Sequence, residues 1–269
     1  IVSGTSKFQI MGQNADDFPE LPEVEQENAY SMNQVKLRDM IRQTIFSIAQ
    51  DDSKPVLTGE LLELREGTVD IVSVDGYRIS FRKNPLLQSS GETEVVVPGK
   101  TLGELNKILS QEEEDVVSIC LTERHILFDL GTAVMVSRLI EGDFIRYAQS
   151  FSDDYKTEVL ISRTELIQAL ERASLVSRDN RKTPVRIEIG ANKLDITARS
   201  DMGTAHEEIG AEIDGDGLTI AFNPRYLIEA LRSIEDEQVR IHFMASLSPC
   251  TLLPVEGDSF KYLILPLRM

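Results

Sequence analysis

Histidines and cysteines are the residues in this sequence that could most readily perform catalysis or hold a metal ion. The three histidines, His125, His206 and His242, lie far apart at strand-like positions. They have neither the spacing of a metal site nor an obvious nucleophile beside them, and isolated histidines are more often structural. The two cysteines, Cys120 and Cys250, are too few for a disulfide framework or a four-cysteine metal site. We therefore expect a non-enzymatic protein without cofactor or metal, in a reducing, cytoplasmic environment.

Two acidic stretches resemble cation sites only superficially. Residues 112–115 read Glu-Glu-Glu-Asp between a predicted helix and a predicted strand, where a charged run is usually a solvated loop. Residues 214–217 read Asp-Gly-Asp-Gly but lack the later ligands of a calcium-binding loop. The second stretch is therefore predicted to be a turn.

The carboxyl-terminal segment suggests a different chemistry, the binding of apolar groups. Residues 262–269 read Tyr-Leu-Ile-Leu-Pro-Leu-Arg-Met, a predicted final strand in which a proline and an arginine interrupt an apolar run. A soluble protein normally buries or shortens such a run at its end. We expect a binding surface here, and the alternative is an ordinary core strand.

Composition limits what the rest of the chain can be. The 269 residues are 41% hydrophobic and 27% charged, which suffices for one large domain or two domains of ordinary size. The longest apolar stretches are far shorter than the roughly 20 residues of a membrane helix, so no membrane association is expected. The sequence opens Ile-Val-Ser-Gly without an initiator methionine, and we expect it to be the remainder of a longer chain.

Positive charge is concentrated in four segments with helical signatures, residues 33–50, 99–109, 162–182 and 224–232. They hold twelve basic and six acidic residues, a net charge of +6, whereas the whole chain has a net charge of −17. One helix of this kind only reflects the preference of Lys and Arg for exposed faces, but four favour a polyanionic partner such as DNA. The basic residues are Lys36, Arg38, Arg42, Lys100, Lys107, Arg163, Arg172, Arg178, Arg181, Lys182, Arg225 and Arg232.

An internal repeat organises these segments. The apolar pattern of residues 37–56 returns in residues 166–185 at a spacing of 129, and residues 97–105 correspond to 222–231 at about 125. Each half runs strand, helix, several alternating strands, second helix and further strands, which predicts a repeated α+β domain with antiparallel sheets. Residues 15–19 echo 141–145 and are interpreted as the end of a preceding unit. Such an array, with basic helices on one side, suits curvature around a polyanion.

Three motifs within this repeat resemble those of one family. They are Ser73-Val74-Asp75-Gly76-Tyr77-Arg78-Ile79, Phe222-Asn223-Pro224-Arg225-Tyr226-Leu227 and Leu265-Pro266-Leu267-Arg268-Met269. The sequence resembles the bacterial DNA polymerase sliding clamp, the beta subunit of DNA polymerase III. The resemblance implies a DNA replication processivity factor, a non-catalytic part of the holoenzyme, in which two three-domain subunits form a ring with helices lining the hole. It further implies that residues 1–25 end the first domain, 26–150 form the second and 151–269 the third.

The same resemblance implies two binding surfaces. The basic helix residues would face double-stranded DNA without reading its sequence. A groove between the second and third domains would bind short apolar peptides of the DNA polymerase III alpha subunit, the clamp loader, other polymerases and repair proteins. Its lining would be Leu57, Val74, Gly76, Tyr77, Arg78, Ile79, Leu247, Pro249, Leu263, Leu265, Pro266, Leu267 and Arg268, with Asn223 and Tyr226 nearby. An alternative is a protein-interaction scaffold that does not encircle DNA.

Some positions depart from the family pattern. Residues 144–147, Phe-Ile-Arg-Tyr, lack the proline that usually follows the phenylalanine, and Gln149 and Ser150 replace a basic and an apolar groove residue. Pro55 and Val56 occupy a loop where aromatic residues often touch DNA, so no DNA contact is expected there. The first domain, which in the family contacts the third domain of the partner subunit, is expected to be mostly absent, so this chain alone should not close a ring.

Overall fold

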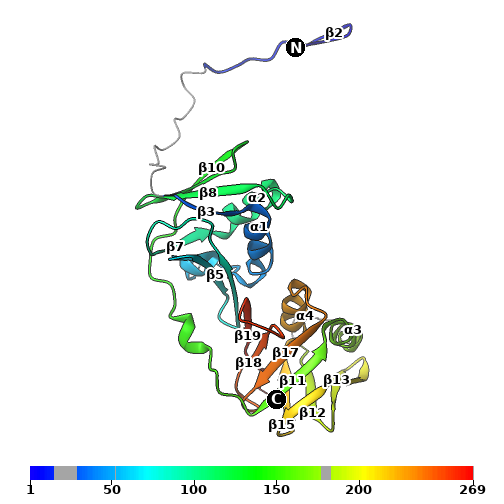
Figure 1. Ribbon diagram of the computed structural model, residues 1–269. Helices are drawn as coiled ribbons and strands as arrows, with labels where there is room; N and C mark the ends of the chain where they lie inside the picture. The colour runs from blue at the N-terminus through cyan, green and yellow to red at the C-terminus, as the bar shows by residue number, and fades with distance from the viewer. Residues whose placement is uncertain (15–28, 52, 177–182, 269) are drawn as a thin grey trace.

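The computed structural model describes residues 1–14, 29–51, 53–176 and 183–268 as two similar halves that follow a small amino-terminal hairpin (Figure 1). The helices are α1 (Gln34–Arg42), α2 (Gly99–Ile108), α3 (Arg163–Ser174) and α4 (Pro224–Ser233). The described residues also form the short 3₁₀ turns η2 (Ile45–Ser47), η3 (Pro55–Thr58) and η4 (Tyr147–Ser150). Each half thus contributes two α-helices, as the repeat predicts.

The strands follow the same repeating order. The amino-terminal hairpin is β1 (Val2–Ser3) and β2 (Ser6–Lys7). The first half contains β3 (Tyr30–Asn33), β4 (Gly59–Arg65), β5 (Thr68–Val74), β6 (Arg78–Pro85), β7 (Thr93–Pro98), β8 (Val116–Leu121), β9 (His125–Asp129) and β10 (Val134–Arg138). The second half contains β11 (Thr157–Ser162), β12 (Val185–Gly190), β13 (Lys193–Ser200), β14 (Gly203–Gly210), β15 (Glu212–Gly215), β16 (Leu218–Phe222), β17 (Gln238–Phe243), β18 (Cys250–Leu253) and β19 (Phe260–Ile264).

The two halves share one sheet, which the sequence did not reveal. Its nine strands run in the order β15-β11-β17-β18-β19-β6-β5-β4-β7, and β6 of the first half pairs antiparallel with β19 of the second. Two four-stranded sheets, β10-β9-β8-β3 and β14-β13-β12-β16, complete the halves. All recorded strand pairs are antiparallel, which confirms the predicted α+β class.

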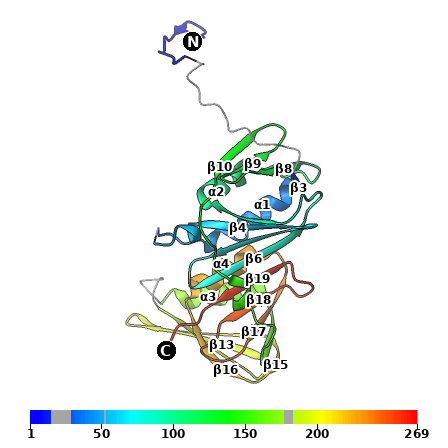
Figure 2. The ribbon, with the colours of Figure 1, turned by 90° about the vertical axis from the view of Figure 1, so that its left-hand side faces the viewer.

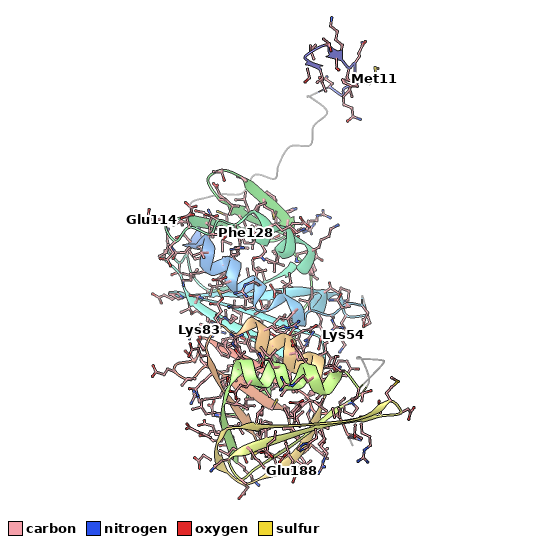
Figure 3. The ribbon with its side chains drawn as sticks, turned by 90° about the vertical axis from the view of Figure 1, so that its right-hand side faces the viewer. Met11, Lys54, Lys83, Glu114, Phe128 and Glu188 are labelled. Carbon is pink, nitrogen blue, oxygen red and sulfur yellow. The ribbon has the colours of Figure 1, made fainter. Side chains whose placement is uncertain are left out.

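Helices and the shared sheet occupy opposite faces of the molecule. Figure 3 shows α1, α3 and α4 on one face, and Figure 2, seen from the other side, shows strands β4, β6, β19, β18 and β17 across it. Each half has a core of its own, in which Leu37 and Leu102 of the first half correspond to Leu166 and Leu227 of the second. Alternation of buried and exposed residues along β12 is typical of a strand with one solvated face.

The helix boundaries differ from the predictions in the first helix of each half. The predicted helices over 99–109 and 224–232 are confirmed, and Pro224 at the start of α4 follows Asn223, whose side chain accepts a hydrogen bond from the Arg225 N–H. The helix predicted over 33–50 ends at Arg42, because Thr44 leaves helical geometry and its carbonyl accepts a hydrogen bond from Ser73. The helix predicted over 162–182 ends at Ser174, and residues 177–182 lie outside the described residues.

Candidate functional site

The predicted groove residues gather where β6 meets β19. Leu57, Val74, Ile79 and Leu263 are all buried in one apolar cluster at this junction. In the shared sheet, Ile79 of β6 lies opposite Leu263 of β19, so the two halves supply neighbouring side chains. The floor of the predicted groove is therefore built by both halves of the chain.

Three of the predicted groove residues are large, apolar and exposed. Leu247, Tyr77 and Leu265 are 70%, 58% and 39% exposed, which is unusual for large apolar residues. The Leu265 N–H donates to the Tyr77 carbonyl and the Leu267 N–H to the Ala221 carbonyl, so the segment after β19 is held between β6 and β16. The Tyr77 ring stacks on the Tyr226 ring with centroids 6.1 Å apart.

Arg78 lies inside this junction rather than on its surface. Its side chain is 6% exposed, and it donates to Asp75 at 2.9 Å, to Glu229 of α4 at 2.5 Å and to the Phe46 carbonyl at 2.6 Å. The guanidinium also lies over the rings of Phe46 and Tyr226, at 5.1 and 4.5 Å from their centroids. We predicted that Arg78 lines the groove, but in this structure its donors are directed to partners from both halves.

Comparison with known proteins agrees with this geometry. Residues 31–145 match the central domain, and residues 149–268 the C-terminal domain, of the DNA polymerase III beta subunit. The whole chain is 33% identical over 270 residues to the beta sliding clamp of Staphylococcus aureus and covers 71% of that protein. The chain belongs to the beta sliding clamp family.

Two crystal structures of sliding clamps are similar along the whole chain. The DNA polymerase sliding clamp of Bacillus subtilis is 32% identical with a TM-score of 0.95, over 99% of this chain and 71% of that one. The beta subunit from the DNA polymerase of Streptococcus pyogenes is 32% identical with a TM-score of 0.93, over 100% and 73%. As a sliding clamp, the chain is a DNA replication processivity factor and a non-catalytic subunit of DNA polymerase III.

Two of the three histidines of this clamp have recorded side-chain partners. Nε2 of His206 is 3.0 Å from Asp195, and Nε2 of His242 is 2.7 Å from Glu158. In the described part of the chain, no group of three or more His, Cys, Asp or Glu side chains is arranged to hold a metal ion. Burial raises the pKa of the Cys250 thiol, which keeps it protonated and unreactive. Among the described residues, no helix is long and apolar enough to cross a membrane.

The structure describes nine of the twelve predicted DNA-facing residues, all on the four helices, and six of these nine already have a protein partner. Lys107, Arg172, Arg225 and Arg232 form ion pairs with Glu104, Glu207, Glu229 and Glu171, and Arg42 pairs with Asp39 and Glu235. Arg163 donates to the Asp236 carbonyl at 2.8 Å. Among the described residues, Lys36, Arg38 and Lys100 make no recorded ion pair. Arg178, Arg181 and Lys182 lie outside the described residues.

A pocket beside the groove uses residues that the sequence did not identify. A cavity of about 200 Å³ is lined by Ser152, Tyr155, His242 and Met244 together with the predicted Pro249 and Leu263. Tyr155 and His242 stack with their ring centroids 3.9 Å apart. Residues 150–155 belong to the linker between the halves. Their position in the sequence could have indicated this pocket, because a linker that crosses the junction of two halves is well placed to form the wall of a pocket there.

The linker itself is fastened to the first half. Tyr147 is buried, its hydroxyl donates to Glu63 at 2.5 Å, and its ring lies 6.3 Å from Phe81 and 6.5 Å from Phe151. Burial, followed by the hydrogen bond and charge of Glu63, raises the pKa of Tyr147, so the hydroxyl stays protonated and remains a donor. These contacts fix the course of the linker that leads into residues 150–155.

Proposed function

We propose that this clamp, in its full-length form, closes head to tail with a second copy into a ring around double-stranded DNA in the cytoplasm. The ring would tether the DNA polymerase III alpha subunit, the clamp loader and other polymerases and repair proteins through the groove. In this proposal, residues 1–25 end the first domain, 26–150 form the second and 151–269 the third. The main support for this proposal, among the described residues, is an unpaired edge strand in each half, β10 in the first and β14 in the second. The repeat equivalents of these two strands, β19 and β6, pair with each other.

The strand edges follow from the repeat. Residues 78–85 of β6 correspond to residues 203–210 of β14 at the spacing of 125, and β10 occupies in its sheet the place of β19. Within the chain, β6 pairs with β19 and joins the halves. Among the described residues, β14 and β10 are edge strands, and an exposed edge is a template for pairing with another strand. By analogy with the β6–β19 pair, β14 is expected to pair with a strand equivalent to β19 in another domain, and β10 with a strand equivalent to β6.

An exposed side chain lies near one of these edges. Phe46 after α1 packs against the next half, with its ring 6.0 Å from that of Tyr262. Leu175, its equivalent after α3, is 81% exposed. The exposure of Leu175 is explained if another domain covers this side chain, in the way that the second half covers Phe46. Head-to-tail contacts of this kind generate closed rings.

The amino-terminal hairpin supports the assignment of residues 1–25. β1 and β2 pair across Gly4, whose φ is 60°, just as β9 and β10 pair across a turn that contains Gly131 with a φ of 78°. Only glycine adopts this conformation without a steric penalty. The hairpin thus corresponds to the last hairpin of a clamp domain.

The charge pattern supports DNA passing along the helix face. Lys36 and Arg38 of α1 and Lys100 of α2 make no recorded ion pair among the described residues, so they remain available to phosphates. Weak contacts of this kind hold a duplex without fixing its position, because a closed ring is retained by topology rather than by affinity. A strongly acidic remainder of the chain would discourage DNA from adhering elsewhere.

The test compares nicked circular DNA with the same DNA after linearisation. The full-length protein is loaded by its clamp loader, separated from free protein by gel filtration, and the DNA is then cut once. Loss of the protein upon linearisation is the expected result, because a ring slides off a free end. Equal retention on both forms would indicate ordinary surface binding, and no retention on either would favour the scaffold that does not encircle DNA.

A further inference from the structure

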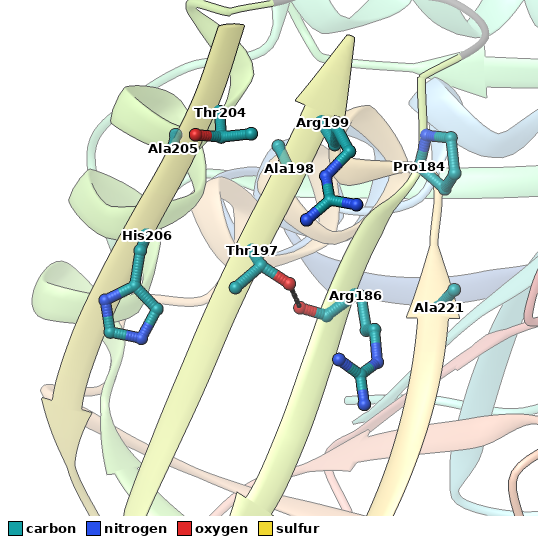
Figure 4. A pocket seen from close by; sticks show the side chains of 9 residues that line it. All are labelled: Pro184, Arg186, Thr197, Ala198, Arg199, Thr204, Ala205, His206 and Ala221. Carbon is teal, nitrogen blue, oxygen red and sulfur yellow. Dashed lines mark hydrogen bonds between the residues drawn. The ribbon is translucent and has the colours of Figure 1, made fainter.

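A second hollow lies on the sheet β14-β13-β12-β16, outside the groove. It has a volume of about 490 Å³ and is open to solvent. Figure 4 shows the side chains of Arg186, Arg199 and His206 on neighbouring strands around it. Among the described residues, no acidic side chain lines this hollow, in a chain whose net charge is −17. The described residues that line it are Pro184, Arg186, Thr197, Ala198, Arg199, Thr204, Ala205, His206 and Ala221.

The register of the sheet places the charged and hydroxyl side chains of this lining on the outward face. Ala221, Arg186, Thr197 and His206 are directly paired across the four strands and therefore lie on one side of the sheet. The alternate residues of β12, including Ile187, are buried in the core with α3. The hollow thus faces away from the helix face that we assign to DNA.

The positive charge of the hollow is only partly neutralised. Arg186 donates to Glu188 at 3.3 Å through one nitrogen, and its side chain is half exposed. Arg199 is exposed and has no recorded ion pair among the described residues. His206 faces Asp195. Two guanidinium groups therefore retain free N–H donors, and guanidinium is the group that best matches a carboxylate in paired hydrogen bonds.

The hollow and the predicted groove are linked by backbone contacts between the terminal segment and the sheet. The Leu267 N–H donates to the Ala221 carbonyl at 2.8 Å, so the terminal segment extends this sheet beyond β16. Ala221 in turn lies opposite Arg186. With neighbouring strands about 4.8 Å apart, the Arg186 backbone is about 10 Å from that of Leu267. About three extended residues of a bound peptide span this distance, at roughly 3.3 Å each.

We propose that this hollow binds an acidic segment of partner proteins, two or three Asp or Glu residues placed next to the apolar residues that occupy the groove. Arg186 and Arg199 bind the carboxylates, and Thr197 and Thr204 lie beside them. The inference rests on the proposed groove, and it adds a second determinant by which partners with equal apolar motifs differ in affinity.

The test uses three labelled peptides in fluorescence polarisation. One is an apolar core with two alternating leucines and a terminal phenylalanine; the others extend this core by Asp-Glu-Glu at the amino or at the carboxyl end. Matched peptides carry Asn-Gln-Gln instead. Each is titrated against the wild-type chain, the double variant R186Q/R199Q and the control R124Q, which removes an exposed arginine of the other half.

We expect one acidic extension to tighten binding about three- to tenfold at 50 mM salt, and the advantage to vanish near 0.5 M salt because exposed charges are screened. R186Q/R199Q should lose this advantage while binding the unextended core as the wild type does, and R124Q should keep it. Equal affinity of acidic and amide extensions, or an advantage that survives in R186Q/R199Q, overturns the proposal. Failure of the unextended core to bind the wild type contradicts the groove itself.

A nucleic-acid ligand is distinguished in the same assay. A short single-stranded oligonucleotide is added as competitor to the acidic peptide. If it displaces the peptide at micromolar concentration and requires Arg186 and Arg199, the hollow is a phosphate site and the peptide assignment is wrong. Displacement that is absent, or equal in R186Q/R199Q, supports the peptide assignment.

Discussion

Replacing Arg78 by methionine should destabilise the contact between the two halves far more than its single charge suggests. The change removes one donor each from the carboxylates of Asp75 and Glu229 and from the Phe46 carbonyl, while Asp75 keeps its bonds from two backbone N–H groups. Breaking a buried ion pair costs about 3–5 kcal/mol, and this range must be reduced because Glu229 is 25% exposed and keeps a bond to Arg225. Loss of the contacts with two aromatic rings adds about 1 kcal/mol. We expect the free energy of unfolding to fall by about 3 kcal/mol.

The assay is equilibrium unfolding in urea followed by circular dichroism, with the variants R78M, R78K, E229Q and R78M/E229Q. Lysine keeps the charge but cannot serve three partners, so R78K should recover only part of the loss. The double-mutant cycle with Glu229 should give a coupling of about 1–3 kcal/mol. R225M is the matched control, since Arg225 bonds to the same carboxylate but is 53% exposed, and it should change stability by less than about 1 kcal/mol.

The reasoning fails if R78M and R225M destabilise the protein equally, or if the coupling to Glu229 is below about 0.3 kcal/mol. Either result would mean that Arg78 contributes no more than a surface ion pair. A loss of peptide affinity without a loss of stability would return Arg78 to the role that we predicted from the sequence, a direct contact with the peptide.

Three further predictions concern the groove, the helix face and the core. L265A/L267A should weaken an apolar peptide roughly 10- to 1,000-fold in fluorescence polarisation and leave the melting temperature unchanged, because neither side chain is buried. K36E/R38E should impair retention on circular DNA and lower the salt dependence of DNA binding by about two units, while peptide affinity is kept. Burial raises the pKa of Glu60 to about 8, although an interaction with the Thr44 side chain opposes the shift. Since the folded protein holds this proton more tightly than the unfolded chain, stability should fall by up to about 1.4 kcal/mol per pH unit between pH 5 and 8, and E60Q should remove this slope in thermal unfolding at several pH values.

The sequence predicted the architecture well because it repeats itself. Leu37 and Leu166, or Leu102 and Leu227, occupy equivalent core positions in both halves, so a pattern ambiguous in one copy was supported by the other. Helix ends were predicted less well, because α1 ends where Thr44 enters contacts with strands distant in sequence. Periodicity does not record such contacts.

The candidate site was predictable in its apolar part only. Leucine, isoleucine and valine at alternating positions indicate a buried face, and Val74, Ile79 and Leu263 indeed meet in one cluster. The partners of Arg78 could not be predicted, since Glu229 lies 151 residues away on a helix whose orientation to β6 depends on the β6–β19 pairing. The ion pairs that neutralise Arg172 and Arg232 are likewise long-range in sequence, so counting charges overstated the free positive charge of the helix face.

The position of the groove links peptide binding to the geometry of the ring. Its floor is formed by side chains of both halves, and the segment from Leu265 to Leu267 is held by carbonyl groups of Tyr77 in one half and Ala221 in the other. A peptide that contacts both walls binds the docked arrangement and not a separated one, so it must stabilise the junction in proportion to its occupancy. By reciprocity, anything that loosens the junction must weaken the peptide by the same factor. Because β6 and β19 belong to a single sheet, a change in the curvature of the clamp must change the shape of its binding surface, and the reverse also holds. This coupling acts although DNA and peptide occupy opposite faces in our proposal.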